Sequence, residues 1–308
     1  MGGSETLCQR GVGAVNRVAA IVLNWNGLDD TVECLESLRL NDYPCLEIIV
    51  VDNGSVDRSV EVIRERFPEV HVIENGRNLG FVKGNDIGLL AALERGAELL
   101  VLLNNDTVLR PDCIRELVEA LQRDESIGIA GPLMQRTLHS NFIEMGGDFN
   151  FWTGLVHLRR FDPAVQDEGI QYIDYVWGCG LMVRAKVLAK VGLLDERYTA
   201  YYEDADFCKR ARIGGYRTVV ATRAWMVHKW GRSGEKRFVW QTYLRLRNHW
   251  MFFLRYARPY QWVTLLPALT FYYTPDLFLQ TVRVYVARKV MPRYRDRSIS
   301  LWFRPPTR

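Results

Sequence analysis

Residues 99–107 read Leu-Leu-Val-Leu-Leu-Asn-Asn-Asp-Thr, five apolar residues followed at once by two amides and a carboxylate. A short apolar run of this kind predicts a strand that is buried on both faces. Its polar carboxyl end would lie where ligands bind in open α/β sheets. There Asp106 could hold a hard cation together with phosphate oxygens and water. The same residues could instead form a strand-to-helix turn capped by Asp106 or Thr107, so the rest of the chain has to decide.

Three segments before this stretch repeat the pattern of an apolar strand that ends in a polar loop. The strands are expected over residues 17–23, 46–51 and 70–73, with helices over about 29–38, 55–67 and 83–95. Strands that alternate with helices predict a parallel sheet whose strand ends gather at one edge. The chain contains neither Gly-x-Gly-x-x-Gly nor Gly-x-x-x-x-Gly-Lys-Ser/Thr, so it indicates neither a dinucleotide fold nor a P-loop.

The chain after residue 110 shows a less regular pattern. Helices are expected over about 111–123, 185–191 and 203–213, strands over 128–132, 176–183 and 216–221, and a turn at 224–228. The strand over 176–183 is expected to pair centrally in the sheet. Residues 136–173 are expected to be irregular, because Gly146-Gly147 and Asp162-Pro163 interrupt them.

Polar residues at the predicted strand ends are candidates for binding a nucleotide. Asp52 could accept a hydrogen bond from a uracil or thymine imide or from a ribose hydroxyl, or it could hold an Asx-turn. Asn24 and Asn26 could bond a base or a diphosphate, although lone asparagines are often turn residues. Gly80-Phe81 with Asn85 offers a close backbone approach and an amide, although the phenylalanine by itself fits a hydrophobic core.

An acidic cluster and a histidine occur later in the chain. Glu203, Asp204 and Asp206 open a predicted helix, where acids also suit the helix macrodipole. A carboxylate there could instead act as a general base that deprotonates an acceptor hydroxyl. His228 ends a strand and could bind a metal or a phosphate, although a lone histidine is usually structural. Arg232 could neutralise a departing diphosphate.

Six motifs in this order resemble family 2 glycosyltransferases of the GT-A fold, and are most similar to the bacterial rhamnosyltransferase branch. The resemblance covers about residues 17–235 and is more specific for the fold and for sugar transfer than for the sugar. The motifs are Val22-Leu23-Asn24-Trp25-Asn26, Val51-Asp52-Asn53-Gly54-Ser55, Asn78-Leu79-Gly80-Phe81, Leu103-Asn104-Asn105-Asp106, Gly178-Cys179-Gly180 and Tyr202-Glu203-Asp204-Ala205-Asp206-Phe207-Cys208.

The resemblance implies an inverting reaction with one base and no covalent intermediate. Asp204 resembles that base, with Glu203 a close second. Asp106 resembles the metal-binding acid of an Asp-x-Asp motif, but Asn104 stands at the first acidic position. His228 resembles the histidine that completes the metal shell in some members. The implied cofactor is Mg²⁺ or Mn²⁺, which would stabilise the departing diphosphate.

The remaining site residues are assigned by the same resemblance. The acceptor is expected to contact Trp177, Gly178, Cys179 and Gly180. The nucleotide sugar is expected to contact Asn24, Asn26, Asp52, Asn53, Asn78, Gly80, Phe81, Asn85, Asn105 and Arg232.

The carboxyl-terminal quarter differs from the rest in charge. Residues 232–308 hold 15 Lys or Arg and 3 Asp or Glu, whereas the first 231 residues hold 25 and 33. A basic segment rich in aromatic residues suggests an anionic surface as partner. A helix is expected over 236–258. Residues 260–275 are uncharged but too short to span a bilayer, so they fit interfacial helices, or else a helical extension packed on the domain or on a dimer partner.

We therefore predict an α/β chain with a GT-A nucleotide-diphospho-sugar transferase fold, in which helices cover both faces of a mainly parallel central sheet. A flexible leader (1–16) would precede a catalytic domain (17–235) made of a nucleotide-binding half (17–110) and an acceptor-binding half (111–235). A helical, membrane-interacting extension (236–308) would follow. The six cysteines form no Cys-x-x-Cys pair, which favours reduced thiols over disulfides or zinc.

The predicted function is inverting, metal-dependent transfer of a sugar, with L-rhamnose from dTDP-rhamnose favoured. The acceptor would be a lipid-linked (polyprenyl diphosphate) saccharide at the cytoplasmic face of the cell membrane, in cell-envelope polysaccharide synthesis. The alternatives are a glycosyltransferase that uses a UDP- or GDP-sugar, and, with less support, a nucleotidyltransferase or a non-catalytic binding protein. No nucleic-acid partner is expected, and a homodimer stays open.

Asp106→Ala tests whether residues 104–106 are a metal site or a turn. We expect the variant to lose sugar transfer without unfolding. The sheet is expected to be stabilised by burial of the apolar strand before Asp106 and not by the Asp106 carboxylate. Transfer assays with manganese and circular dichroism would measure the two effects. Retained activity at ordinary manganese concentrations would mean that the stretch is only a turn.

Overall fold

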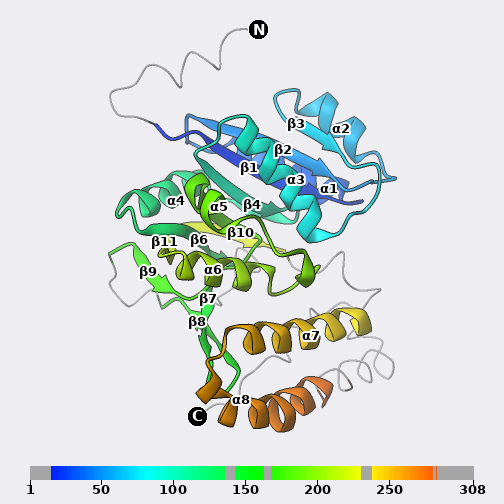
Figure 1. Cartoon of the computed structure of the whole chain (residues 1–308). Coiled ribbons are helices and arrows are strands. Elements are labelled where there is room, and N and C mark those ends of the chain that lie inside the picture. Colours follow the sequence, from blue (N-terminus) through cyan, green and yellow to red (C-terminus); the bar gives the residue numbers. More distant parts are fainter. Residues whose placement is uncertain (1–14, 136–142, 163–167, 230–237, 280–281, 283–308) are drawn as a thin grey trace. The chain divides into compact units, whose positions relative to one another are not determined.

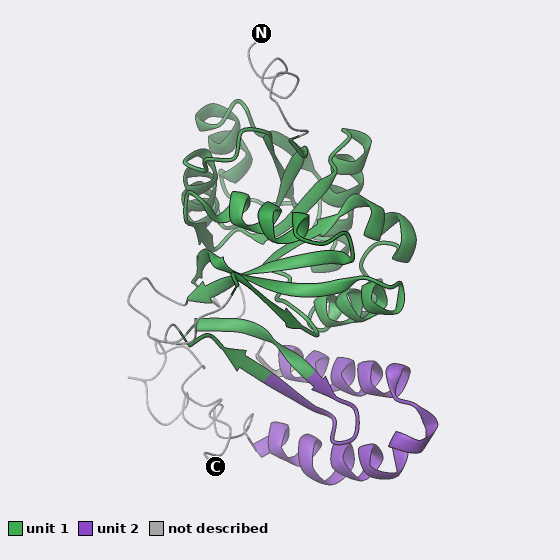
Figure 2. Cartoon of the chain, turned by 90° about the vertical axis from the view of Figure 1, so that its left-hand side faces the viewer, with its two compact units in different colours: residues 1–148, 158–229 green, residues 149–157, 230–308 purple. Residues whose placement is uncertain are grey.

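The computed structural model describes residues 15–135, 143–162, 168–229, 238–279 and 282. The chain divides into two compact units, which Figure 2 colours separately. Unit 1 takes in residues 1–148 and 158–229, and unit 2 takes in residues 149–157 and 230–308. The predicted site residues fall in the described part of unit 1, except for Arg232, which lies outside the described residues.

Unit 1 is built on one mixed sheet (Figure 1). Four mutually parallel strands form one side of it, in the order β3 (His71–Glu74), β2 (Leu46–Asp52), β1 (Val18–Asn24) and β4 (Leu99–Asn104). Beyond β4 follow β10 (Gly180–Arg184), β6 (Ile127–Gln135), β11 (Arg217–His228) and β5 (Thr107–Leu109). The first four strands confirm the parallel half that the sequence predicts.

The sheet as a whole is not mainly parallel, because β10 runs antiparallel to both of its neighbours, β4 and β6. β5 is also antiparallel to β11, whereas β11 is parallel to β6. A buried apolar strand needs the same side chains in either direction, so residues 176–183 could not reveal their orientation. The strand also begins only at Gly180, and residues 176–179 form the loop before it.

The segment 136–173 is not irregular, as the sequence suggested, in its described part. It contains β7 (Ile143–Asn150), β8 (Leu155–Arg160) and β9 (Ile170–Ile173). Gly146, expected to break a strand, lies inside β7 with a φ of 112°. A Cβ at this position would meet the Tyr175 carbonyl oxygen at 2.3 Å, so the glycine permits close backbone packing. Likewise, β11 continues through residues 224–228, where a turn was expected.

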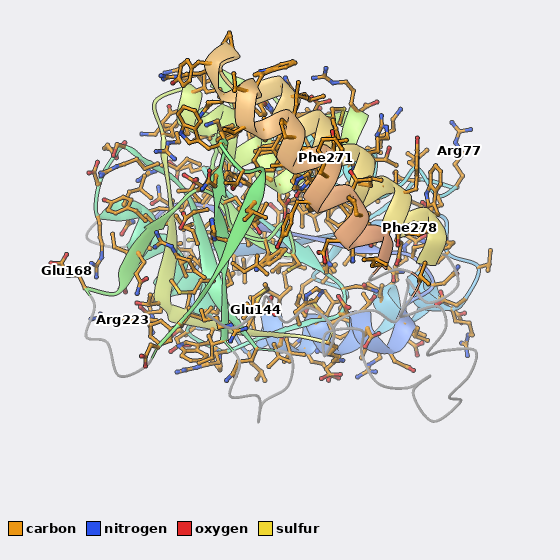
Figure 3. The ribbon with its side chains drawn as sticks, turned by 90° about the horizontal axis from the view of Figure 1, so that it is seen from below. Arg77, Glu144, Glu168, Arg223, Phe271 and Phe278 are labelled. Carbon is orange, nitrogen blue, oxygen red and sulfur yellow. The ribbon has the colours of Figure 1, made fainter. Side chains whose placement is uncertain are left out.

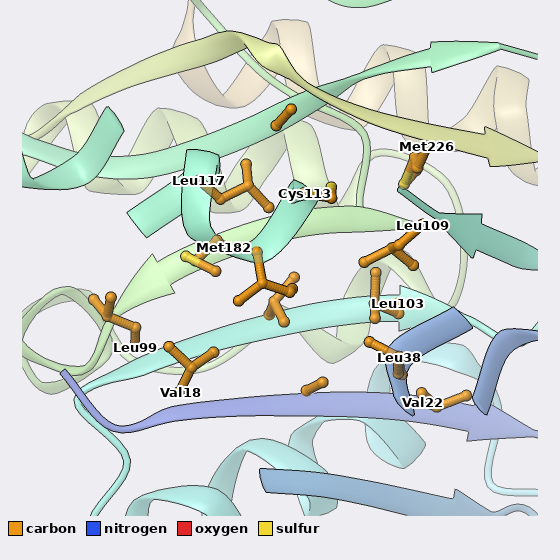
Figure 4. Packing of buried hydrophobic residues seen from close by; sticks show 14 of the residues in the cluster. Val18, Val22, Leu38, Leu99, Leu103, Leu109, Cys113, Leu117, Met182 and Met226 are labelled. Atoms are coloured by element: carbon orange, nitrogen blue, oxygen red, sulfur yellow. The ribbon is translucent and has the colours of Figure 1, made fainter. Parts of the chain in front are cut away.

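Helices cover both faces of the sheet (Figure 1). Because side chains alternate along a strand, Val18 and Val22 of β1 face one cluster while Ile21 faces the other side. Figure 4 shows Val18 and Val22 in the same buried cluster as Leu38 and Leu117, which come from two of the helices. The helices of unit 1 are α1 (Leu28–Arg39), α2 (Ser59–Arg66), α3 (Phe81–Glu94), α4 (Cys113–Gln122), α5 (Ala185–Val191) and α6 (Glu203–Ile213).

Unit 2 consists of helices packed on residues 149–157. Its helical elements are α7 (Phe238–Tyr256), η3 (Pro259–Gln261), α8 (Trp262–Ala268) and the π turn η4 (Leu269–Tyr273). The ring centroids of Phe149 and Phe252 are 4.5 Å apart, and those of Phe151 and Phe253 are 5.2 Å apart. The helix expected over 236–258 is confirmed over residues 238–256. No helix in the described part of the chain is long and apolar enough to cross a membrane.

The cysteines depart in one place from the expected reduced thiols. Cys34, Cys113, Cys179 and Cys208 are free and buried, but Cys45 is disulfide-bonded. Disulfide pairing depends on the separation of two Cα atoms in space, which sequence spacing does not reveal.

Gly88→Ala tests the close packing of α3 on the sheet. A Cβ at Gly88 would meet Ile21 Cγ2 at 2.3 Å and Val51 Cγ2 at 3.0 Å, so the helix would have to move outward. Overpacking costs about 1–3 kcal/mol, more than the roughly 0.5–1 kcal/mol that alanine gains over glycine within a helix. We expect a loss of stability in urea denaturation. Leu90→Ala, at an exposed position of the same helix, should change stability far less, and equal losses would contradict this packing.

Candidate functional site

Three polar strand ends meet at the carboxyl edge of the parallel half of the sheet. Asn24 at the end of β1 donates from Nδ2 to Asp52 Oδ1 at the end of β2, at 2.9 Å. Asn105, just after β4, donates from Nδ2 to Asn24 Oδ1 at 3.3 Å and to Thr31 Oγ1 at 3.0 Å. The structure thus confirms that these strand ends share one edge, and Thr31 of α1 is a member that the sequence did not single out.

Asp52 holds the turn that follows β2. Its Oδ2 accepts hydrogen bonds from the backbone N–H groups of Gly54 (3.1 Å) and Ser55 (2.8 Å). Its Oδ1 accepts from Ser55 Oγ at 2.6 Å as well as from Asn24. The side chain is buried, so this is the Asx-turn that the sequence left as an alternative. Direct contact of Asp52 with a base or ribose stays a prediction.

Asn53 connects the end of β2 to the loop before α3. Its Nδ2 donates to Gly80 O at 3.1 Å and to Asn78 Oδ1 at 3.2 Å, and its Oδ1 accepts from the Leu79 N–H at 3.0 Å. A Cβ on the neighbouring Gly54 (φ 74°) would lie 2.5 Å from the Cα of Arg77, which Figure 3 labels. The two loops are therefore packed backbone to backbone.

The remaining predicted donor residues lie around these loops. Asn26 is exposed with a φ of 51°, and its Oδ1 accepts from the Val56 N–H at 2.7 Å. Phe81 is the first residue of α3 and is partly exposed. Asn85 is buried one turn later and donates from Nδ2 to Phe81 O at 3.0 Å. Their contact with a nucleotide stays a prediction.

Asp106 and His228 lie side by side although 121 residues separate them. β5 and β11 pair so that Thr107 is opposite His228, which brings His228 Nε2 to 3.1 Å from Asp106 Oδ1. Asn104 Nδ2 lies 3.4 Å from the same nitrogen. Burial favours the neutral imidazole, but the Cys179 and Asp106 side chains outweigh it and raise the pKa of His228 to about 10. Asp106 Oδ1 and His228 Nε2 therefore lie within hydrogen-bond distance of each other at this edge of the sheet.

The acid pair Glu203 and Asp204 opens α6, directly after Tyr201 and Tyr202, which both have positive φ. Asp204 Oδ2 accepts from the Gly178 N–H at 2.9 Å, and its Oδ1 accepts from its neighbour Ala205 N–H at 2.7 Å. Burial raises the pKa of both carboxyls, and the charge of Asp204 raises that of Glu203 further. Asp204 is partly exposed, whereas Glu203 is buried.

The loop before β10 connects the acid pair with the histidine. Gly178 binds Asp204 through its backbone, and the side chain of the next residue, Cys179, contacts His228. Gly178, Cys179 and Gly180 are buried, and Trp177 is partly exposed. The role that the structure gives these residues is to position Asp204 and His228, and their contact with an acceptor stays a prediction.

Asp206, the third acid of the cluster, does not join the acid pair. It is fully buried and pairs with Arg210 at 2.7 Å. The guanidinium also donates to the backbone oxygens of Val191 (2.6 Å) and Leu193 (2.8 Å). These contacts hold α6 against the end of α5, so Asp206 has a structural role.

Lys229 is a site neighbour that the sequence analysis missed. Its backbone N–H donates to Asp106 O at 3.0 Å, while its Nζ pairs with Asp30 at 3.0 Å and with Glu33, both on α1. The lysine therefore connects the end of β11, next to His228, to helix α1. The two acids in the first turns of α1 were the only sequence signal for such a partner.

The family model described as glycosyl transferase family 2 matches residues 19–192 of this chain. Among curated proteins, the chain is 26% identical over 219 residues to the N-acetylglucosaminyl-diphospho-decaprenol L-rhamnosyltransferase of Mycobacterium tuberculosis, covering 63% of this chain and 70% of the relative. It is 24% identical over 225 residues to the dTDP-rhamnosyl transferase RfbF of Shigella flexneri, covering 72% of each.

Solved structures of sugar transferases share this fold. The mannosyltransferase PcManGT of Pyrobaculum calidifontis, in complex with GDP-Man and Mn²⁺, aligns with a TM-score of 0.57 and 18% identity, covering 86% of this chain and 70% of that one. GalNAc-T7 with UDP, GalNAc and Mn²⁺ aligns with a TM-score of 0.60 and 16% identity, covering 76% and 47%. At these identities the likeness concerns the fold, which is a GT-A-like α/β fold with a mixed sheet.

Glu203→Gln tests the cost of burying an acid. Among the described residues, no group donates a hydrogen bond to Glu203 Oε2. Because the pKa of Glu203 is raised on folding, the folded chain binds a proton that the unfolded chain releases above the usual glutamate pKa of about 4.3. The free energy of unfolding of the wild type therefore falls as the pH rises above about 4.3.

The variant should be more stable than the wild type at pH 8, because glutamine has no proton to lose and so escapes the loss that the wild type suffers, about 1.4 kcal/mol for each pH unit of that range. The difference should shrink towards pH 5, as followed by thermal melting at several pH values. Glu65→Gln, at an exposed position of α2, is the matched control and should show no such trend. A pH-independent gain for Glu203→Gln would mean that its carboxyl is not perturbed.

Proposed function

The chain belongs to glycosyl transferase family 2, and from this premise we propose that it transfers L-rhamnose from dTDP-rhamnose to a lipid-linked saccharide by an inverting, metal-dependent reaction. Its relatives include rhamnosyltransferases, so the chain is a rhamnosyltransferase-like enzyme of the hexosyltransferase class. The observation that carries the proposal is the loop 177–180, which contacts both Asp204 and His228. One short segment thereby fixes the proposed base relative to the proposed metal residues.

The donor is proposed to bind at the three strand ends. Asn24 and Asn105 would contact the nucleotide and its diphosphate, together with Gly80 and Phe81 at the start of α3. The hydrogen bonds between these loops support the proposal, because they preorganise polar groups around one edge of the sheet. Asp52 would act chiefly by holding the turn in place. Arg232 is proposed to neutralise the diphosphate.

Asp106 and His228 are proposed to hold Mg²⁺ or Mn²⁺. A carboxylate oxygen and an imidazole nitrogen 3.1 Å apart are donors of the right kind for such ions, and Nε2 would give up the proton that it holds towards Asp106 when the ion binds. The described residues hold no cluster of three or more His, Cys, Asp or Glu fit for a metal, so the donor diphosphate and water would complete the shell. When bound, the ion would stabilise the charge that develops on the departing diphosphate. The Mn²⁺ in the two structural neighbours is in keeping with this.

Asp204 is proposed to be the general base. The backbone amides of Gly178 and Ala205 fix its carboxylate, and its partial exposure leaves it able to reach an acceptor hydroxyl. As the hydroxyl oxygen bonds to the anomeric carbon, the bond from that carbon to the diphosphate breaks and the hydroxyl proton passes to Asp204. A raised pKa suits a base that must take up this proton. Glu203, the second candidate, is buried beside it.

The acceptor is proposed to be a saccharide on a polyprenyl diphosphate at the cytoplasmic face of the cell membrane. The support is the name of the mycobacterial relative, which acts on N-acetylglucosaminyl-diphospho-decaprenol. The basic, aromatic segment 236–308 is proposed to reach the membrane surface. Trp177 is proposed to contact the acceptor, and a homodimer is compatible with the proposal.

The main alternative is a donor with another nucleotide or sugar. It is favoured by the GDP-Man and UDP that the structural neighbours contain. A thermal-shift panel of dTDP-, UDP- and GDP-sugars, each with and without manganese, separates the two. We expect dTDP-rhamnose with manganese to give the largest shift. A shift with a UDP- or GDP-sugar alone would overturn the rhamnose assignment, and no shift with any nucleotide sugar would overturn the donor site.

Asp204→Asn separates the base from the binding site. We expect turnover to fall about 10²- to 10⁴-fold, the usual contribution of a general base, while the nucleotide-sugar thermal shift stays unchanged. Asp29→Asn, at an exposed position of α1, is the control and should keep full activity. If Glu203→Gln abolished turnover while Asp204→Asn did not, the base would be Glu203.

A further inference from the structure

The helical segment 262–279 of unit 2 is apolar on two faces. Its inner face, Leu265, Leu269 and Leu277, is buried. The spacing from Leu269 to Leu277 is longer than two turns of an α-helix. The π turn η4 has more residues per turn than an α-helix, so both leucines still lie on one side. Opposite them lies the surface that we call the outer face.

The outer face is unusually exposed for apolar side chains. Phe271 is 80% exposed, Val263 78% and Phe278 65%, and the exposed Leu266 and Leu279 extend the surface. Figure 3 shows the two phenylalanines along the same helix. An exposed apolar surface of this extent marks a contact with a partner.

The surroundings of the outer face identify the chemistry of that partner. Residues 259–275 contain no charged side chain, and the exposed Arg255 and Arg258 come just before them. The described residues of unit 2 contain four arginines and one acid, Asp276. An exposed apolar segment that follows exposed cations in the chain matches an anionic lipid layer, in which acyl chains lie beneath negative headgroups.

Aromatic side chains with polar tips are exposed on the same segment and just before it. Tyr260, Trp262 and Tyr272 are all exposed. Tyrosine and tryptophan favour the boundary between headgroups and hydrocarbon, where the ring is apolar and its polar atom stays wet. Since the uncharged run is shorter than the roughly 20 residues that a span needs, the segment suits an orientation parallel to the membrane.

We propose that the outer face of unit 2 is a membrane-binding surface that lies in the plane of the bilayer interface. Phe271 and Phe278 enter the acyl region, while Arg255 and Arg258 contact anionic headgroups. This inference deepens the proposed use of a lipid-linked acceptor and rests on that function for its purpose, but lipid binding itself can be measured without sugar transfer.

Vesicle co-sedimentation of the full chain tests the surface. Vesicles of phosphatidylglycerol and phosphatidylcholine should bind the chain more tightly than phosphatidylcholine alone, and salt should weaken the difference. The double variant Phe271→Ser, Phe278→Ser should bind at least about tenfold more weakly. Each substitution removes the favourable free energy of moving a phenylalanine side chain from water into an apolar region. The matched control is Leu40→Ser, Val56→Ser, at two exposed positions of unit 1, which should bind as the wild type does. Equal binding by both double variants would overturn the proposal.

A dye that reports polarity, attached at Phe271→Cys, distinguishes lipid from other occupants. Its emission should shift to the blue only when vesicles are added. A blue shift without vesicles that grows with protein concentration would identify a second copy of the chain, and one independent of concentration would mean that the chain covers the surface itself. Either result overturns the proposal. The unsubstituted chain, treated with the same dye, supplies the background.

The thermal shift that dTDP-rhamnose gives with manganese distinguishes a failure of this surface from a failure of the proposed function. The double variant should retain the wild-type shift, since the substitutions lie outside the donor site. Vesicle binding without any nucleotide-sugar shift would remove the proposed function and leave the surface in place. A normal shift without vesicle binding would remove the surface alone.

Discussion

The direction of β10 is the constraint on which the candidate site depends. Because β10 is antiparallel to β4, with Gly180 opposite Leu103, the chain enters the strand at the edge where β4 ends. The loop before β10 therefore lies at the same edge as Asn104, Asn105 and Asp106. In a parallel arrangement that loop would lie at the far edge, and Gly178 could not bond Asp204 near His228. One reversed strand thus brings together residues that lie far apart in the sequence of unit 1.

The site is built from buried polar groups, and most of them are compensated within the protein. Asp52 accepts four hydrogen bonds, Asp206 pairs with Arg210, and Asp106 pairs with His228. Such satisfied networks hold side chains in one arrangement, which a reaction between two bound substrates requires. Glu203 is the exception, because burial is not offset by a donor to its Oε2. The free-energy cost of burying the Glu203 carboxyl therefore arises where the proposed chemistry would occur, as is common at active sites.

The features that could be predicted were those with a local sequence pattern or a family motif. The parallel strands β1 to β4 were predictable from their apolar runs and polar ends, and the nearness of Asp106 to His228 followed from a family resemblance. The direction of β10 was not predictable, because Leu181, Met182 and Val183 suit a buried strand of either direction. Gly146 was misleading, since a glycine that permits close packing inside β7 looks the same in sequence as one that ends a strand. That Asp52 holds its turn was one of two alternatives in the sequence, because the choice depends on the four donors that surround its carboxylate.

The sequence of unit 2 is discontinuous, because residues 149–157 belong to it although they lie in the middle of the chain. Phe149 and Phe151 pack on Phe252 and Phe253, and Thr264 Oγ1 donates to Trp152 O at 2.7 Å. The carboxyl-terminal helices are therefore not a module that recombination could append to another catalytic domain unchanged. A domain that acquired them would also need a hairpin with matching aromatic rings. Inheritance of the two segments should be coupled, so that changes at the hairpin tip accompany changes in α7 across related chains.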